Sequence, residues 1–432
     1  MRFSRLLSLA VVLACRNADS TGASLPYQTT FTTIGDTVVA ATTGDVPDHL
    51  LRRYVIEWRA TGDSGSDLFG EVGNIAVAPD GKVWVWDGTT PALFLFDADG
   101  KLIRRVSRRG SGPGEYQRVN DIAVARDGAL VMWDEGNSRL NVYNADGTFR
   151  TSANLGFSDC CGQPVMVDSQ NRIWLKAHPR SITRKEKAFD ANDFGKPEVI
   201  AYFRYDSAGA LIDTIIPPTL PGADGVLTSL KVTSTSIGGR SRRVPYGTYP
   251  MEVASPFGHV VLAMSRPYVV HTEANGKHVR LTRESTPVPV GDEERAQERE
   301  NIAFSMRQVS SEWKWNGPEI PREKPPIEDL LVGLDGRIWV QLSVPSEPFE
   351  PDTMATESNP FSGTRDRAPP VKFRPKEKRW DVFEPDGRYL GRILVPREIS
   401  TYVVRGNNVW GVIRDENDVP TVVRLRIEPA FR

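Results

Sequence analysis

The chain has few residues of the kinds that hold small folds together covalently or through metals: 3 cysteines and 5 histidines among 432 residues. Two of the cysteines, Cys160 and Cys161, are adjacent, so they either form a strained vicinal disulfide or stay free. Two thiols without further ligands make a poor zinc site, and no two histidines have the spacing HxH or HxxxH. The sequence therefore excludes a disulfide framework, and a histidine-bound metal is not expected.

An excess of charge of one sign is also missing. The chain has 54 basic and 55 acidic residues and a formal net charge of −1, which gives no electrostatic footprint for nucleic acid. Short basic runs, such as residues 240–243, are expected to be solvated strand ends and loops. Beyond the N-terminus no stretch is apolar for 18 residues, so no further membrane span is expected.

The N-terminus reads "MRFSRLLSLAVVLAC", in which two arginines precede a short apolar run. The run is too short for a transmembrane helix and indicates an export signal. Its end, "VLAC", resembles the lipobox of bacterial lipoproteins, which implies cleavage after residue 14 and lipidation of Cys15. The alternative is an ordinary secretory signal. Residues 15–49 are then a tether and N-terminal extension, since residues 16–26 are small and polar.

A repeat begins at residue 50 and extends to the end of the chain. The segment "VGNIAVAPDGKVWVWD" at residue 72 returns 47 residues later as "VNDIAVARDGALVMWD". Each unit has four short apolar segments, and turns at Asp-Gly pairs such as Asp80-Gly81 separate the first segment from the second and the third from the fourth. Four antiparallel strands per unit are typical of a β-propeller blade.

The register continues through six units. The residue three places after each first turn forms a column, which reads Trp84, Val131, Trp174, Val261, Trp339 and Trp410. Aromatic residues at this place are expected to pack between neighbouring blades. The sequence therefore predicts an all-β, six-bladed β-propeller of four-stranded antiparallel blades over residues 50–432.

The sixth unit lacks its outer strand. Residues 54–59 align, again at an offset of 47, with the fourth strand of the first blade, so we expect them to close the last blade and the ring. Insertions are expected near residues 178–197, 284–326 and 343–379. A helix is predicted over residues 291–315, with Asp292 as its N-cap and a packing stripe that contains Met306, Val309 and Trp313.

The blades resemble the NHL-type six-bladed β-propellers, in particular the bacterial "6-bladed beta-propeller" lipoprotein family. The segments "NDIAVARDGALVMWDEGNSRLNVYNADGTF", "RRGSGPGEYQRVNDI" and "RWDVFEPDGRYLG" carry the resemblance, which extends over roughly residues 50–428. It implies the fold and an exported, lipid-anchored protein at the bacterial cell envelope. The arginine after Cys15 favours the outer membrane by family analogy. Related propellers include calcium-dependent lactonases and lyases that hold a metal through histidines.

The predicted channel offers the best candidate site. First strands line the channel of a propeller, and the polar residues expected just before them are Asn74, Asp121, Glu252 and Asp329. Pro164 and Ser400 hold the same place in the other two blades, and Asn120, Gln163 and Glu328 are neighbours. Three carboxylates and an amide around one axis suit Ca²⁺ or a cationic ligand group. A water-filled polar mouth is the alternative, and the identity of any metal stays open.

No arrangement of residues for nucleophilic catalysis is present, since the chain has no GxSxG segment. We therefore expect a membrane-tethered binding module for a protein or glycan partner at the envelope, rather than an enzyme. Two alternatives remain: a calcium-dependent hydrolase or lyase that uses the channel mouth, and a structural subunit of an envelope complex.

Overall fold

The structure is a computed structural model. It describes residues 13–15, 25–60, 69–106, 109–155, 164–177, 200–221, 229–234, 238–350, 356–358, 365–367 and 369–431. Cys160 and Cys161 and the expected insertion near 178–197 lie outside these residues. Among the described helices, none is long and apolar enough to cross a membrane.

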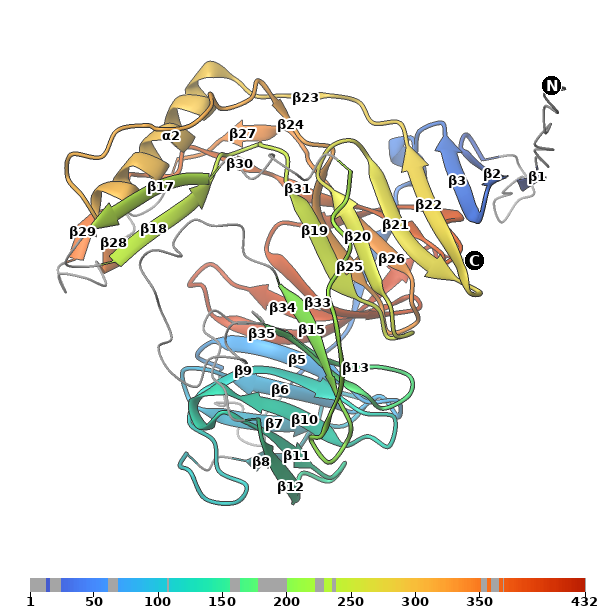
Figure 1. Cartoon of the computed structure of the whole chain (residues 1–432), viewed down its shortest axis with the longest axis vertical. Coiled ribbons are helices and arrows are strands. Elements are labelled where there is room, and N and C mark those ends of the chain that lie inside the picture. The colour runs from blue at the N-terminus through green and yellow to red at the C-terminus, as the bar shows by residue number, and fades with distance from the viewer. Residues whose placement is uncertain are drawn as a thin grey trace, which may run out of the picture.

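Six antiparallel sheets are arranged around one axis, which confirms the predicted six-bladed propeller (Figure 1). The first three blades follow one another along the chain. Blade 1 contains β5 (Val72–Val77), β6 (Val83–Asp87), β7 (Ala92–Phe96) and β8 (Leu102–Val106). Blade 2 contains β9 (Val119–Val124), β10 (Leu130–Asp134), β11 (Arg139–Tyr143) and β12 (Phe149–Asn154). Blade 3 contains β13 (Val165–Val167), β14 (Ile173–Ala177), β15 (Ala201–Tyr205) and β16 (Leu211–Ile215).

The other three blades complete the ring. Blade 4 contains β19 (Pro250–Ala254), β20 (Val260–Met264), β21 (Val269–Ala274) and β22 (Lys277–Arg283). Blade 5 contains β25 (Ile327–Val332), β26 (Ile338–Leu342), β31 (Glu377–Phe383) and β32 (Tyr389–Pro396). Blade 6 contains β33 (Ile399–Arg405), β34 (Asn408–Arg414), β35 (Pro420–Glu428) and β4 (Arg53–Arg59). Strand β4 pairs antiparallel with β35, so the predicted ring closure is confirmed.

The turns and the packing column follow the repeat. Gly81 has a φ of +88°, which an L side chain rarely adopts, so glycine suits this Asp-Gly turn. The column of residues three places after the first turns is buried throughout, with Trp84 and Trp174 fully inside. Five clusters of apolar side chains draw on neighbouring blades, as where Trp410 of blade 6 packs with Phe94 of blade 1. Burial between blades therefore holds the ring together.

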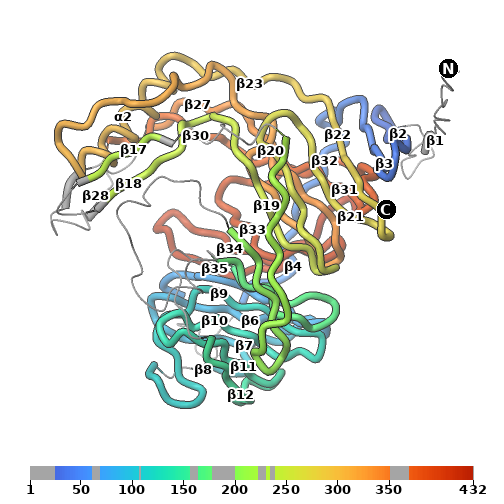
Figure 2. The backbone as a smooth tube through the Cα atoms, in the orientation of Figure 1, coloured from blue at the N-terminus to red at the C-terminus, as the bar shows by residue number. Residues whose placement is uncertain are grey.

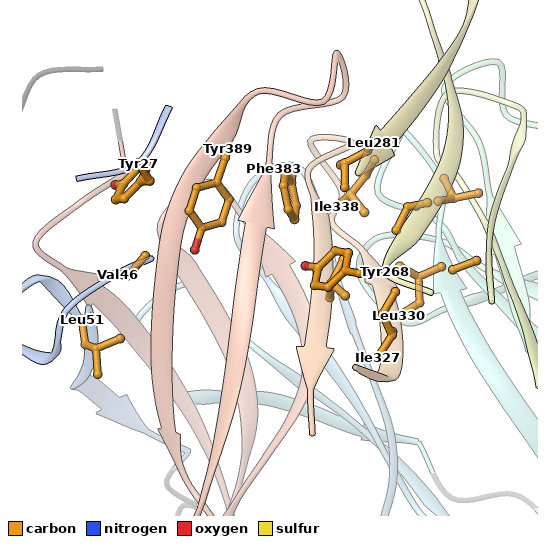
Figure 3. Close-up of a cluster of buried hydrophobic side chains, with 14 residues drawn as sticks. Tyr27, Val46, Leu51, Tyr268, Leu281, Ile327, Leu330, Ile338, Phe383 and Tyr389 are labelled. Carbon is orange, nitrogen blue, oxygen red and sulfur yellow. The ribbon is translucent and has the colours of Figure 1, made fainter. Parts of the chain in front are cut away.

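Residues 28–43 of the expected N-terminal extension form a hairpin that extends blade 4. Strands β2 (Gln28–Ile34) and β3 (Thr37–Thr43) pair with each other, and β3 runs parallel to β22. The short strand β1 (Leu13–Cys15) pairs with β2, and the 3-10 helix η1 spans Asp48–Leu50. Tyr27, Val46 and Leu51 pack beside Tyr389 of blade 5 (Figure 3). The extension therefore pairs with blade 4 and packs against blade 5.

The insertions gather at one end of the molecule (Figures 1 and 2). They comprise the hairpin of β17 (Ser229–Ser234) and β18 (Gly238–Arg243), the helix α2 (Asp292–Arg307), β23 (Val288–Pro289), β24 (Glu323–Lys324), β27 (Ser346–Pro348), β28 (Thr356–Ser358), β29 (Arg365–Arg367) and β30 (Phe373–Pro375). The predicted packing residues are buried together with Leu230 and Val244, but only Met306 is on the helix, and Val309 and Trp313 follow its end.

Two local expectations about the insertions were wrong. The helix N-cap is Gly291, and Asp292 is instead the first helical residue, paired with Arg322 at 3.2 Å. The helix also ends at Arg307 and not at residue 315. The basic run at residues 240–243 is the end of β18, with Arg242 and Arg243 exposed as expected, and it also contacts the helix. Arg240 Nη1 donates to the Ser305 carbonyl oxygen at 2.5 Å, and Arg242 Nε donates to Ser305 Oγ at 3.2 Å. The run therefore holds the helix against the hairpin.

Candidate functional site at the channel mouth

The four predicted mouth residues occupy equivalent places on the innermost strands. Asn74, Asp121, Glu252 and Asp329 are each the third residue of β5, β9, β19 and β25. They lie inside these strands and not before them, because pairing begins two residues earlier than the repeat alone indicated. Register shifts next to the mouth residue in β5, β9 and β25 are β-bulges, which re-aim side chains at the rim of a sheet.

One carboxylate joins three blades at this mouth. Asp121 Oδ1 accepts hydrogen bonds from Asn74 Nδ2 of blade 1 and from the backbone nitrogen of Ile122 at 2.8 Å. Asp121 Oδ2 accepts from the backbone nitrogen of Val165 in blade 3 at 2.7 Å. Burial raises the pKa of Asp121 to about 7, although the three hydrogen bonds oppose that shift. Asp121 therefore titrates near neutral pH while it ties blades 1, 2 and 3 together.

The other two carboxylates have different surroundings. Glu252 Oε1 lies 3.2 Å from Lys176 Nζ of blade 3. Asp329 Oδ1 accepts from the backbone nitrogen of Leu330 at 2.8 Å, and burial raises the pKa of Asp329. Of the remaining expected mouth residues, Pro164 directly precedes β13 and Ser400 is the second residue of β33. Gln163 lies outside the described residues.

Blade 5 contributes Glu328, an expected neighbour of the mouth, together with Gln341 and Lys378, which the sequence did not single out. Glu328 Oε2 accepts from Gln341 Nε2 at 2.9 Å, and the Glu328 carbonyl oxygen accepts from the Tyr249 hydroxyl at 2.9 Å. Burial raises the pKa of Glu328 and lowers that of Lys378, which donates to the Ile399 carbonyl oxygen at 3.1 Å. Two carboxyl groups with raised pKa values thus lie near a lysine with a lowered pKa.

The arrangement does not gather the four predicted side chains into one cluster. Asn74 and Asp121 touch, Glu252 pairs with Lys176, and Asp329 belongs with Glu328 and Lys378. Within the described part of the chain, no group of three or more His, Cys, Asp or Glu side chains could hold a metal ion. Calcium at the mouth stays a prediction, and so does the alternative of a calcium-dependent hydrolase.

The polar residues that contact Glu252 and Glu328 also stand out in the sequence repeat, once the structure is known. Five residues after the first turns, the second strands have Trp86, Trp133, Lys176, Ala263, Gln341 and Val412. Most of this column is apolar, and its two polar members, Lys176 and Gln341, contact the mouth residues Glu252 and Glu328. A polar side chain in an otherwise apolar column therefore marks the mouth of the channel.

The titration of Asp121 leads to a prediction about stability. Because the folded state raises this pKa from 3.8 to about 7, folding favours the protonated form. The free energy of unfolding, relative to an Asp121→Asn variant, should fall as the pH rises from about 4 to about 7 and then level off. The total change is at most about 4 kcal/mol, from about three pH units at 1.36 kcal/mol each. Urea unfolding between pH 4 and 8 measures it.

The control is Asp99→Asn, which keeps a turn sequence compatible with a hairpin and lies at an exposed position. It accounts for any general effect of exchanging an aspartate for an asparagine. A difference between wild type and Asp121→Asn that stays constant over this pH range, or that increases with pH, would contradict the assignment.

Comparisons with known proteins agree with this fold. A family model described as "6-bladed beta-propeller" matches residues 61–204. No curated protein matches the chain. The class that the sheets and the family model define is therefore a six-bladed β-propeller.

Several solved structures are similar over most of the chain at low identity. A Bacteroides fragilis protein proposed to be exported has 14% identity and a TM-score of 0.45, with 91% of this chain and 99% of that chain covered. A member of the DUF4221 family from Bacteroides vulgatus has 12% identity and a TM-score of 0.44, with 88% and 99% covered. A gluconolactonase from Xanthomonas campestris has 12% identity and a TM-score of 0.36, with 98% and 99% covered.

Proposed function

We propose that this protein is an exported, lipid-anchored propeller that binds a protein or glycan at the bacterial cell envelope through its channel-mouth face. The mouth face is the side on which the first strands begin. In an antiparallel four-stranded blade, connections between the second and third strands, and between one blade and the next, also lie on this side. The turns between first and second strands and between third and fourth strands lie on the opposite side, here called the turn face.

The observation that carries the proposal is where the perturbed carboxyl groups lie. Four described aspartate and glutamate side chains have a raised pKa, in each case mainly through burial: Asp121, Glu298, Glu328 and Asp329. Three are on the innermost strands at the mouth, and Glu298 is on the helix α2 in a connection on the same face. Groups with shifted pKa values concentrate at functional sites, so their location favours the mouth face.

The chemistry of these groups suits a neutral polar ligand. A protonated carboxyl group donates one hydrogen bond and accepts others, whereas a carboxylate only accepts. Asp121, with a pKa of about 7, can therefore donate to as well as accept from the hydroxyls of a glycan or the amides of a peptide. The buried Asn120 Nδ2, beside Asp121 on β9, finds no hydrogen-bond partner among the described residues. A buried donor without a partner costs free energy.

The insertions support the same face. The hairpin β17–β18, the helix α2 and the strand pair β27–β30 all arise from connections on the mouth side. Long connections in compact domains are usually functional, and here they enlarge the surface around the mouth. The turn face carries short turns, such as residues 97–100 and 274–277.

Photo-crosslinking in bacterial cells tests the proposal. A benzophenone amino acid is introduced into the full chain at exposed positions of the mouth face, Thr90 and Glu347, and of the turn face, Lys101 and Asn275. We expect adducts, detected as mass shifts by antibody and by glycan staining, to be at least tenfold more abundant at the mouth-face positions. A Cys15→Ser version, which cannot be lipidated, is expected in the soluble fraction.

The matched positions make the outcome decisive. Equal adducts from both faces, or adducts from the turn face alone, would overturn the assignment of the binding face. Cells in which no mouth-face position gives an adduct would overturn the binding function itself. Membrane association of Cys15→Ser that equals wild type would overturn the lipid anchor.

A further inference from the structure

A pair of histidines meets on the outer hairpin of blade 4. His271 is on β21 and His278 is on β22, and the hairpin between these strands turns at the turn face (Figure 1). His271 Nδ1 lies 3.1 Å from His278 Nε2, and the ring centroids are 5.3 Å apart with 26° between the ring planes, so the two rings meet edge to edge at these nitrogens. Because the two histidines are on different strands, they do not have the spacing HxH or HxxxH in the sequence.

The distance between the nitrogens is compatible with two arrangements. One is a hydrogen bond, in which one ring donates and the other accepts. The other is a shared metal ion, since imidazole nitrogens bind Zn²⁺ at 2.0–2.1 Å. Two bonds of this length to nitrogens 3.1 Å apart enclose an angle of about 95–100°, between the octahedral and tetrahedral values. An ion at this distance from both nitrogens lies off the line that joins them, so both rings must turn toward it when it replaces the shared proton.

The histidine pair has both acidic and basic neighbours, which respectively favour and oppose binding of a cation. In the antiparallel register Glu273 is opposite His278, and Arg280 is opposite His271. Glu273 is exposed, and its carboxylate is the nearest acidic group on these two strands, while Arg280 and Lys277 add positive charge. Burial, together with His278 and Arg280, lowers the pKa of His271.

We propose that His271 and His278 form a two-histidine binding site for a divalent transition metal of the Zn²⁺ or Ni²⁺ class, on the rim opposite the channel mouth. Imidazole suits these ions, whereas Ca²⁺ prefers oxygen ligands, so this site differs in chemistry from the expected calcium site. Two protein ligands leave the other coordination positions for water or for a side chain of a binding partner. The pair is exposed enough for a hydrated ion to reach it, since His278 is on the surface.

Calorimetric titration of the full chain in detergent with Ni²⁺ alone tests the site. At pH 7.5 we expect one Ni²⁺ per chain. His271→Ala and His278→Ala should each weaken binding at least tenfold, because one imidazole alone cannot chelate. At pH 5.5 wild-type binding should also weaken at least tenfold, because protons compete for the ring nitrogens.

His259→Ala is the matched control. His259 belongs to the same blade, but its Nε2 lies 3.0 Å from Thr272 Oγ1 and it does not face the pair. Binding by this control should equal wild type. No measurable binding of Ni²⁺ by wild type at 1 mM, or undiminished binding by the double variant of His271 and His278, would overturn the proposal. If His271→Ala fails to fold, His278→Gln at the exposed position carries the test.

Discussion

Replacing Asp381 with alanine is expected to destabilise the fold by about 3–5 kcal/mol, the usual effect of removing one partner of a buried ion pair. Asp381 is on β31, fully buried between blades 4 and 5. Its Oδ1 accepts from Arg392 Nε at 2.8 Å, and its Oδ2 lies 3.2 Å from Arg283 Nε. The arginine side chains are only 10% and 2% exposed, so alanine would leave both charges without this buried partner.

Two tyrosines depend on the same carboxylate. The Tyr389 hydroxyl donates to Asp381 Oδ1 at 2.7 Å, and the Tyr268 hydroxyl donates to Oδ2 at 3.1 Å. Burial, together with the charge of Asp381, raises the pKa of both tyrosines well above the usual value, so both remain donors. The side chain of Tyr389 also packs on Tyr27 of the N-terminal extension, with centroids 4.9 Å apart (Figure 3). Loss of Asp381 should therefore loosen the extension as well.

Asp45→Ala is the control for Asp381→Ala. Asp45 lies in the extension, 3.0 Å from Arg392 Nη1 and 3.4 Å from Arg283 Nη2, but its side chain is 73% exposed. An exposed ion pair contributes about 0–1 kcal/mol, so its loss should be small. Urea unfolding followed by circular dichroism measures both free energies. A cost below about 1 kcal/mol for Asp381→Ala would show that the buried network does not hold blades 4 and 5 together.

The repeat predicted the ring because each blade restates the same pattern. The offset of 47 residues located blades 1 and 2 and the closing strand β4, and the turn residues kept the register through the insertions. The extension has no such copy elsewhere. Its strand β3 pairs in parallel with β22, about 240 residues away in the chain. No turn and no regular spacing in the sequence predicts a pairing of that kind.

For the candidate site, too, the repeat predicted the positions of the residues but not their contacts. The repeat placed Asn74, Asp121, Glu252 and Asp329 at one level of the ring, and the structure has each of them at the same position of its strand. Their partners follow no common rule. Asp121 bonds to the backbone of the next blade, whereas Glu252 meets Lys176. Such contacts depend on side-chain lengths and on the angle between blades, which a repeat alone does not specify.

Replacing Ile56 with proline in β4 is expected to cost about 3 kcal/mol or more and to reduce the cooperativity of unfolding. Proline removes a backbone donor and fixes φ, so it disrupts the pairing of β4 with β35. This pairing also aligns Glu57 with Arg424 at 2.7 Å. Without it, blade 6 presents an open edge, and the two ends of a chain segment of several hundred residues are no longer held together.

Ile103→Pro is the matched control, because Ile103 holds the equivalent place in the outer strand β8 of blade 1. The two isoleucines are similarly exposed, at 41% and 48%. Both substitutions damage one outer strand, but β8 can separate while the ring stays closed. Ile56→Pro should therefore cost more, with tryptophan fluorescence and circular dichroism giving separate urea midpoints and proteolysis cutting first near β4 and β35. Equal costs with coincident transitions in both variants would mean that β4 is an ordinary outer strand, and that packing between blades holds the ring closed without it.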